Sequence, residues 1–156
     1  MVLERGRSSR LNRLLVEDLD LAGSVSAGYV TRKHPSAFLV WMELPPDNRS
    51  RAVSALLGAC SALGEERLSE DELEKAKALI EAAMLFERET SEGQARYHGY
   101  WAAVGGPGFA ESYLPRPAEV TAEGVQRVAA EYLRPELHVA AAVVPEWVAE
   151  TPEKGR

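Results

Sequence analysis

The chain has 156 residues, of which 46% are hydrophobic and 27% charged, a composition typical of one globular domain or two very small ones. Its formal charge of −6 gives nucleic-acid binding no electrostatic support, and no apolar run approaches the roughly 18–20 residues that a membrane helix needs. The single Cys60 excludes an internal disulfide and a cysteine-based zinc site. Because the first residues lack an apolar stretch like that of a signal peptide, we expect a cytoplasmic protein.

The first part of the chain predicts a helix followed by a β-hairpin. Ser8 or Ser9 can cap a helix whose leucines recur at three- and four-residue spacing and so share one buried face: Leu11, Leu14, Leu15 and Leu19. Small and apolar residues alternate between positions 21 and 31, which is typical of a half-buried strand. Residues 37–44 predict a second strand, with a helix as the alternative, because the short connector around Pro35 suits a hairpin.

Helices dominate the second part of the sequence. A helix capped by Asp47 or Asn48 runs to about Leu63, and Gly64 is expected to end it. A capping box at 69–72 opens a long helix whose buried stripe is expected to include Leu73, Ala76, Ile80, Ala83 and Phe86. Further helices are expected at about 94–104 and around 109–113, after breaks at Gly93 and in the glycine-rich segment 105–108. Thr121 is expected to cap a last helix to about Leu133, whose inner face is expected to include Val125, Val128, Ala129 and Tyr132.

The last apolar segment predicts a strand. Residues 137–144 read Leu-His-Val-Ala-Ala-Ala-Val-Val and are bounded by Pro135 and Pro145, which is typical of a short buried strand. The expected order is α-β-β-α-α-α-α-β, an α+β fold in which an antiparallel sheet packs against helices. We expect residues 1–146 to form a single domain and residues 147–156 to form a polar tail.

The spacing of reactive side chains predicts no catalytic site. His34, His98 and His138 are isolated, whereas a zinc motif needs two histidines one helical turn apart with a carboxylate. We expect two of them at the surface and His98 packed beside Tyr97 and Tyr100. Cys60 falls on the apolar stripe of its helix, which favours a buried structural thiol over a nucleophile.

One charge asymmetry marks the start of the sequence. Four arginines and one glutamate give the first thirteen residues a net charge of +3, on a chain of charge −6. This basic segment could contact an acidic peptide or partner, and a solvated helix end is the alternative. The candidate peptide or partner contacts are Arg7, Ser8, Ser9 and Arg10.

Four blocks, in order along the chain, resemble the zinc-peptidase family of insulinase, pitrilysin and mitochondrial processing peptidase. They are residues 6–11 (GRSSRL), 21–27 (LAGSVSA), 68–77 (LSEDELEKAK), and 120–129 together with 132–135 (VTAEGVQRVA and YLRP). The resemblance covers about Gly6 to Val144. It implies a repeated α+β domain that pairs into a hollow clamshell enclosing a peptide.

The departures from this family are informative. The inverted zinc motif H-x-x-E-H is missing, and the positions that in the family direct an Arg and a Tyr toward the substrate fall on Val16 and Gly23. The resemblance therefore implies the non-zinc, C-terminal type of domain, with no catalytic or metal residue. It also implies that the family's first strand and helix are missing, which leaves a free strand edge and uncovered apolar surface.

These observations lead to one expected function with two alternatives. We expect a domain that does not cleave peptides on its own and that forms part of a peptide-enclosing chamber with a zinc-bearing partner domain or chain. The alternatives are a part of a zinc metallopeptidase active only in the complex, and a structural remnant without a peptide role. Zinc is expected only in the partner. The missing strand and helix predict a partner chain, self-association or a truncated reading frame, because an uncovered edge tends to recruit another chain.

Overall fold

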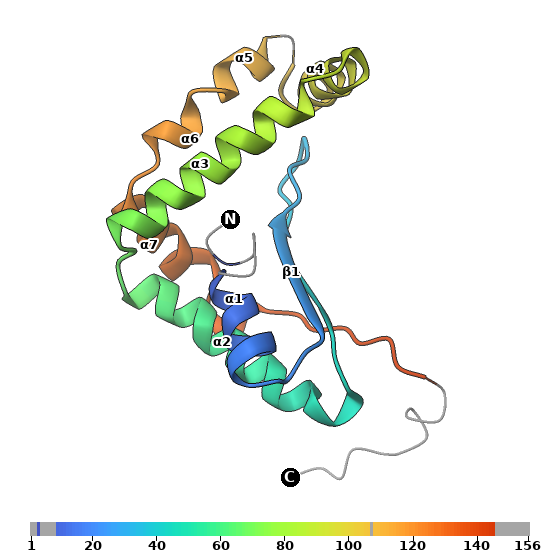
Figure 1. Cartoon of the computed structure of the whole chain (residues 1–156), viewed down its shortest axis with the longest axis vertical. Helices are drawn as coiled ribbons and strands as arrows, with labels where there is room; N and C mark the ends of the chain where they lie inside the picture. Colours follow the sequence, from blue (N-terminus) through green and yellow to red (C-terminus); the bar gives the residue numbers. More distant parts are fainter. Residues whose placement is uncertain (1–2, 4–8, 107, 146–156) are drawn as a thin grey trace.

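The computed structural model describes residues 3, 9–106 and 108–145, and Figure 1 shows an arc of helices with a β-hairpin beside it. The α+β class is confirmed. In chain order the elements are α1 (Arg10–Asn12), the π-helix η1 (Arg13–Asp18), β1 (Ser24–Tyr29), β2 (Phe38–Glu43), the 3₁₀ turn η2 (Pro46–Asn48), α2 (Arg49–Glu65), α3 (Glu70–Glu87), α4 (Ser91–Gly105), α5 (Phe109–Tyr113), α6 (Arg116–Glu119), α7 (Ala122–Tyr132) and the 3₁₀ turn η3 (Pro135–Leu137).

The hairpin forms as predicted, and residues 37–44 contain a strand and no helix. β1 and β2 pair antiparallel, with Ser26 opposite Trp41 and Ala27 opposite Val40. Successive side chains of a strand point to opposite faces, so Ala27 and Val40 join the core while Trp41 stays about half exposed. In β2 the exposed residue next to Trp41 on that outer face is Leu39.

The first helix is capped as predicted, but its last leucine is not buried. The Ser9 hydroxyl accepts a hydrogen bond from the Asn12 amide (3.4 Å). Leu11 and Leu15 are fully buried, yet Leu19 is 41% exposed. The cause is the π-helical turn of η1, in which the Leu19 amide donates to the Leu14 carbonyl (3.1 Å). Bonding to the fifth preceding residue adds a residue to the turn and rotates the following side chains out of the stripe.

Gly64 does not end its helix, which corrects the prediction. α2 continues to Glu65, and Gly64 lies where α7 crosses it. A Cβ at Gly64 would come within 2.9 Å of the Ala130 Cα, so only glycine allows this close approach. The contact closes the main core, which includes Ala52, Leu63 and Ala129.

α3 begins at the predicted capping box, whereas the predicted break at Gly93 is wrong. α4 begins at Ser91, about one turn before the predicted start at residue 94. The reason is that the Thr90 hydroxyl accepts a hydrogen bond from the Gly93 amide (3.0 Å) and so caps the helix there. Phe86, the last residue of the predicted stripe of α3, is exposed in the final turn of that helix. The α7 helix keeps its predicted Thr121 cap, but two residues of its predicted inner face, Val128 and Tyr132, are exposed.

A second, smaller core joins α4 to α5 and is built from aromatic rings. Tyr97 and Trp101 are buried, and the Trp101 and Tyr113 rings lie 4.2 Å apart between centroids. His98 packs edge-on against Tyr97, as predicted, with 5.6 Å between ring centroids. The Tyr100 hydroxyl donates to the Thr31 carbonyl (2.5 Å), which fastens the tip of the hairpin to α4.

The predicted strand at 137–144 is wrong. Within residues 108–145, the chain from His138 to Pro145 has no regular secondary structure, and Val139 and Val143 are 97% and 104% exposed. An extended segment becomes a strand only when a neighbouring strand accepts its backbone hydrogen bonds, and the sheet of the described residues consists of β1 and β2. Figure 1 shows this segment leaving α7 as an extended trace. The predicted tail at 147–156 lies outside the described residues.

Candidate functional site

Of the four residues predicted to contact a peptide or partner, the structure describes Ser9 and Arg10. Arg7 and Ser8 lie outside the part of the chain that the structure describes. Ser9 is 4% exposed, and its hydroxyl caps α1, so its polar atom already has a structural role. Arg10 opens α1 and directs its guanidinium to Glu72 of α3.

The Arg10–Glu72 pair is a bidentate ion pair between segments 62 residues apart. Arg10 Nε lies 2.9 Å from Glu72 Oε1, and Arg10 Nη2 lies 2.9 Å from Glu72 Oε2. Two parallel charge-assisted bonds fix both distance and orientation. Glu72 also accepts from the Ser69 amide (3.4 Å) and hydroxyl (3.2 Å), so one carboxylate completes the capping box of α3 and holds α1.

The electrostatics of this pair follow from its geometry. The Arg10 hydrogen bonds lower the pKa of the Glu72 carboxyl to about 2, and the bonds from Ser69 act in the same direction against partial burial. The same hydrogen bond raises the pKa of Arg10. Sequence reasoning placed Arg10 and Glu72 in separate blocks and missed their contact. The only available signal was their opposite charge, which does not specify a partner 62 positions away.

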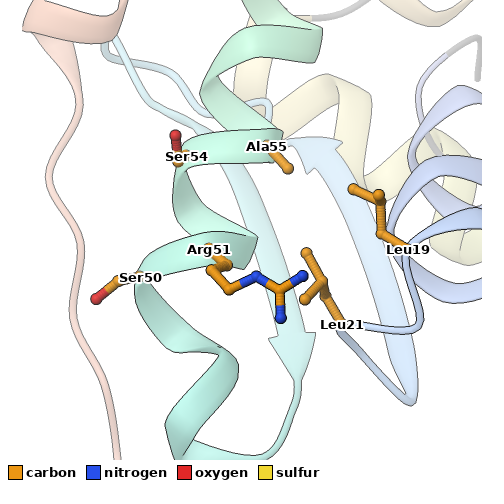
Figure 2. Close-up of a pocket in the computed structure, with 6 residues that line it drawn as sticks. All are labelled: Leu19, Leu21, Ser50, Arg51, Ser54 and Ala55. Carbon is orange, nitrogen blue, oxygen red and sulfur yellow. The ribbon is translucent and has the colours of Figure 1, made fainter.

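A shallow pocket lies between the end of η1 and the start of α2 (Figure 2). Its volume is about 480 Å³, and it is lined by Leu19, Leu21, Ser50, Arg51, Ser54 and Ala55. Figure 2 shows the Arg51 guanidinium alongside Leu21. The lining contains one cation, two hydroxyls and apolar carbon, and it has no general base beside a nucleophile. Sequence reasoning missed the pocket, because it forms only where two separate segments meet.

The side chains that could bind a metal are dispersed. Among residues 3, 9–106 and 108–145, no three His, Cys, Asp or Glu side chains form a group that could hold a metal ion. Cys60 is buried, and burial raises the pKa of its thiol, which disfavours the reactive thiolate. His98 lies 3.7 Å from Glu111 at the surface. That zinc is confined to a partner stays a prediction.

The sequence profile of the family described as the peptidase M16 inactive domain matches residues 1–80. The chain belongs to this family. The match begins in the basic N-terminal segment and ends within α3, so the Arg10–Glu72 pair lies inside the matched part of this M16 inactive domain. A search of curated proteins found no match. The resemblance to this peptidase family is therefore confirmed, and three of the four sequence blocks lie within the matched residues.

Solved structures show the same fold. The inactive peptidase domain from Bordetella parapertussis has a TM-score of 0.80 and 21% identity, over 92% of this chain and 79% of that one. A protease from Helicobacter pylori has a TM-score of 0.76 and 21% identity, over 85% of this chain and 32% of that one. A peptidase M16 inactive domain from Pseudomonas fluorescens has a TM-score of 0.71 and 15% identity, over 84% and 32%. The M16 inactive domain described here thus spans about a third of the two longer chains.

No described helix of this M16 inactive domain has an apolar stretch long enough to reach across a bilayer.

Proposed function

We propose that this M16 inactive domain forms part of the wall of a peptide-enclosing chamber, beside a zinc-bearing peptidase-family domain or chain that performs the cleavage. The observation that carries the proposal is the match of residues 1–80 to a family defined by its inactive domain. The described residues also lack any grouping of metal-binding side chains, and a hydrolytic zinc site needs three protein ligands on one face.

Two structural features support a role beside other domains. Domains of this fold occupy about a third of the chains from Helicobacter pylori and Pseudomonas fluorescens, so the fold occurs next to further polypeptide. The helices of this chain also form an arc rather than a closed bundle, with the hairpin on one side and α3 on the other (Figure 1). This open arrangement of the helices supports a role in which a second domain packs beside this one.

The test compares the purified chain with a mixture of this chain and an H-x-x-E-H chain of the same family. We expect the chain alone to bind less than stoichiometric zinc and to cleave no peptide, and we expect it to co-elute with the zinc-bearing chain. A zinc-bearing chain with the motif Glu changed to Gln serves as the matched control, because it should form the same complex without cleavage. Chelator-sensitive cleavage by the isolated chain would overturn the proposal.

The same mixture separates the two alternatives. If cleavage requires both chains, this chain is a working part of a metallopeptidase that is active only in the complex. If the two chains do not associate and cleavage is unchanged, the chain is a structural remnant without a peptide role. An increase in the peptide affinity of the complex, without zinc on this chain, is the result that the chamber-wall proposal requires.

A further inference from the structure

Residues 139–144 form an extended apolar segment that has no backbone partner among the described residues. They read Val-Ala-Ala-Ala-Val-Val, and all but the half-buried Val144 are exposed. Within the described chain, no hydrogen bond involves their amides or carbonyls; the last one before them joins the His138 amide to the Pro135 carbonyl (3.4 Å). Single exposed apolar residues are ordinary, whereas an exposed run of five with unpaired backbone groups is typical of a surface that another chain covers.

The composition of this segment favours a strand. Three of its six residues are β-branched valines, which fit a pleated surface, and none is charged. Six extended residues span about 20 Å, and β2 is also six residues long. The segment therefore has the length and the composition of a strand and lacks only an edge with which to pair.

The same chain presents a matching edge. β2 pairs with β1 on one side, and within the described residues no backbone hydrogen bond reaches its other side. β1 also contacts α1 and η1, which makes the outer edge of β2 the more open of the two. β2 carries one charge, Glu43 at its end, while Leu39 and Trp41 expose apolar surface along it.

We propose that residues 139–144 of one copy pair with the free edge of β2 in a second copy, and that the exchange is reciprocal. Each copy supplies one unpaired strand and one unpaired edge, of equal length and without opposing charges, so two copies satisfy both in a closed two-fold dimer. Pairing places valines of the added strand beside Leu39 and Trp41, and aromatic and β-branched neighbours across strands stabilise a sheet. This inference does not depend on the proposed chamber function.

The test measures the oligomeric state by sedimentation velocity and amide hydrogen exchange of the full chain at two protein concentrations. We expect a dimer in which amides 139–144 exchange slowly at high concentration and rapidly on dilution. Successive amides of a strand point to opposite edges, so one of the two variants Ala141→Pro and Ala142→Pro removes a donor that faces β2. That variant should raise the dimer dissociation constant about tenfold or more, whereas the other proline faces the outer edge and is tolerated. Ala141→Ser keeps the amide and is the matched control that should remain dimeric.

Three results would overturn the inference. One is a monomer at every concentration tested, and another is a dimer whose amides 139–144 exchange freely. The third is that the Ala141→Pro and Ala142→Pro chains both dimerise as well as the unmodified chain does. Because residues 141 and 142 are exposed and lie outside both cores, circular dichroism should show the same helix content for all of these variants.

Discussion

Replacing Glu72 by Gln should isolate the charge of the ion pair that joins α1 to α3. A Gln at this position can still accept the hydrogen bonds of the capping box, so the change removes the charge and preserves the cap. Lowering the carboxyl pKa from 4.5 to about 2 corresponds to about 3 kcal/mol for a fully isolated pair. The Arg10 and Glu72 side chains are 29% and 38% exposed, so solvent screens the interaction. We expect Glu72→Gln to lower the free energy of unfolding by about 1–2 kcal/mol.

The pH dependence gives this prediction a sign. The folded-state pKa of Glu72 lies below its ordinary value of 4.5, so the ion pair stabilises the fold fully above that value. Its contribution declines as the pH falls through 4.5 toward about 2, where the folded carboxyl protonates. In urea unfolding followed by circular dichroism, the difference between the unmodified chain and Glu72→Gln should therefore be largest near pH 7 and should shrink toward pH 2.

A double-mutant cycle with Arg10→Met measures the coupling between the two side chains directly. The matched control is Asp18→Asn, because Asp18 and Arg13 are mostly exposed and 3.8 Å apart, and this change should leave the free energy of unfolding unaltered within error. A coupling energy below about 0.3 kcal/mol, or a Glu72→Gln effect that is constant between pH 7 and pH 2, would refute the reasoning.

Three further predictions concern the packing of the helices, and each can be measured by urea unfolding. Gly64→Ala should destabilise the fold by about 1–2 kcal/mol, because the added Cβ clashes with Ala130. The control is Gly58→Ala in the same helix, whose Cβ meets nothing within 4 Å and which should stabilise the fold by up to about 1 kcal/mol. Equal effects at both sites would contradict the assigned role of Gly64. Thr121→Ala should lower the free energy of unfolding by about 1 kcal/mol, because it removes the acceptor for the Gly124 amide, and Thr121→Ser should restore this acceptor. A Ser variant as unstable as the Ala variant would argue against capping. Trp101→Ala should lower the free energy of unfolding by about 3–5 kcal/mol, and Trp101→Phe by clearly less, because Trp101 is buried at the centre of the ring cluster. An unfolding midpoint that did not move would show that this cluster does not support the fold.

The local chemistry of the sequence was sufficient for three helix caps and for the hairpin. It was not sufficient for the predicted cap of α2, because the Asn48 side chain accepts no helix amide there and instead donates to the Leu21 carbonyl (3.2 Å). Ser9, the Ser69–Glu72 box and Thr121 each cap a helix as predicted, because a capping side chain acts on amides two or three residues away. The alternation in residues 21–31 likewise predicted β1, because side chains of a strand repeat every two residues within one short segment.

Tertiary structure decided the features that depend on a distant segment. Gly64 has the composition of a helix stop, but the crossing of α7 makes it a contact point, and no local pattern reports where a second helix will lie. The Arg10–Glu72 pair and the pocket beside Arg51 form only after segments far apart in the chain meet. Residues 139–144 have the composition of a strand, yet a strand also requires a neighbour to accept its backbone hydrogen bonds. Whether that neighbour is present is a property of the fold and of its assembly, so the sequence determined the potential of this segment and the tertiary structure left it unpaired.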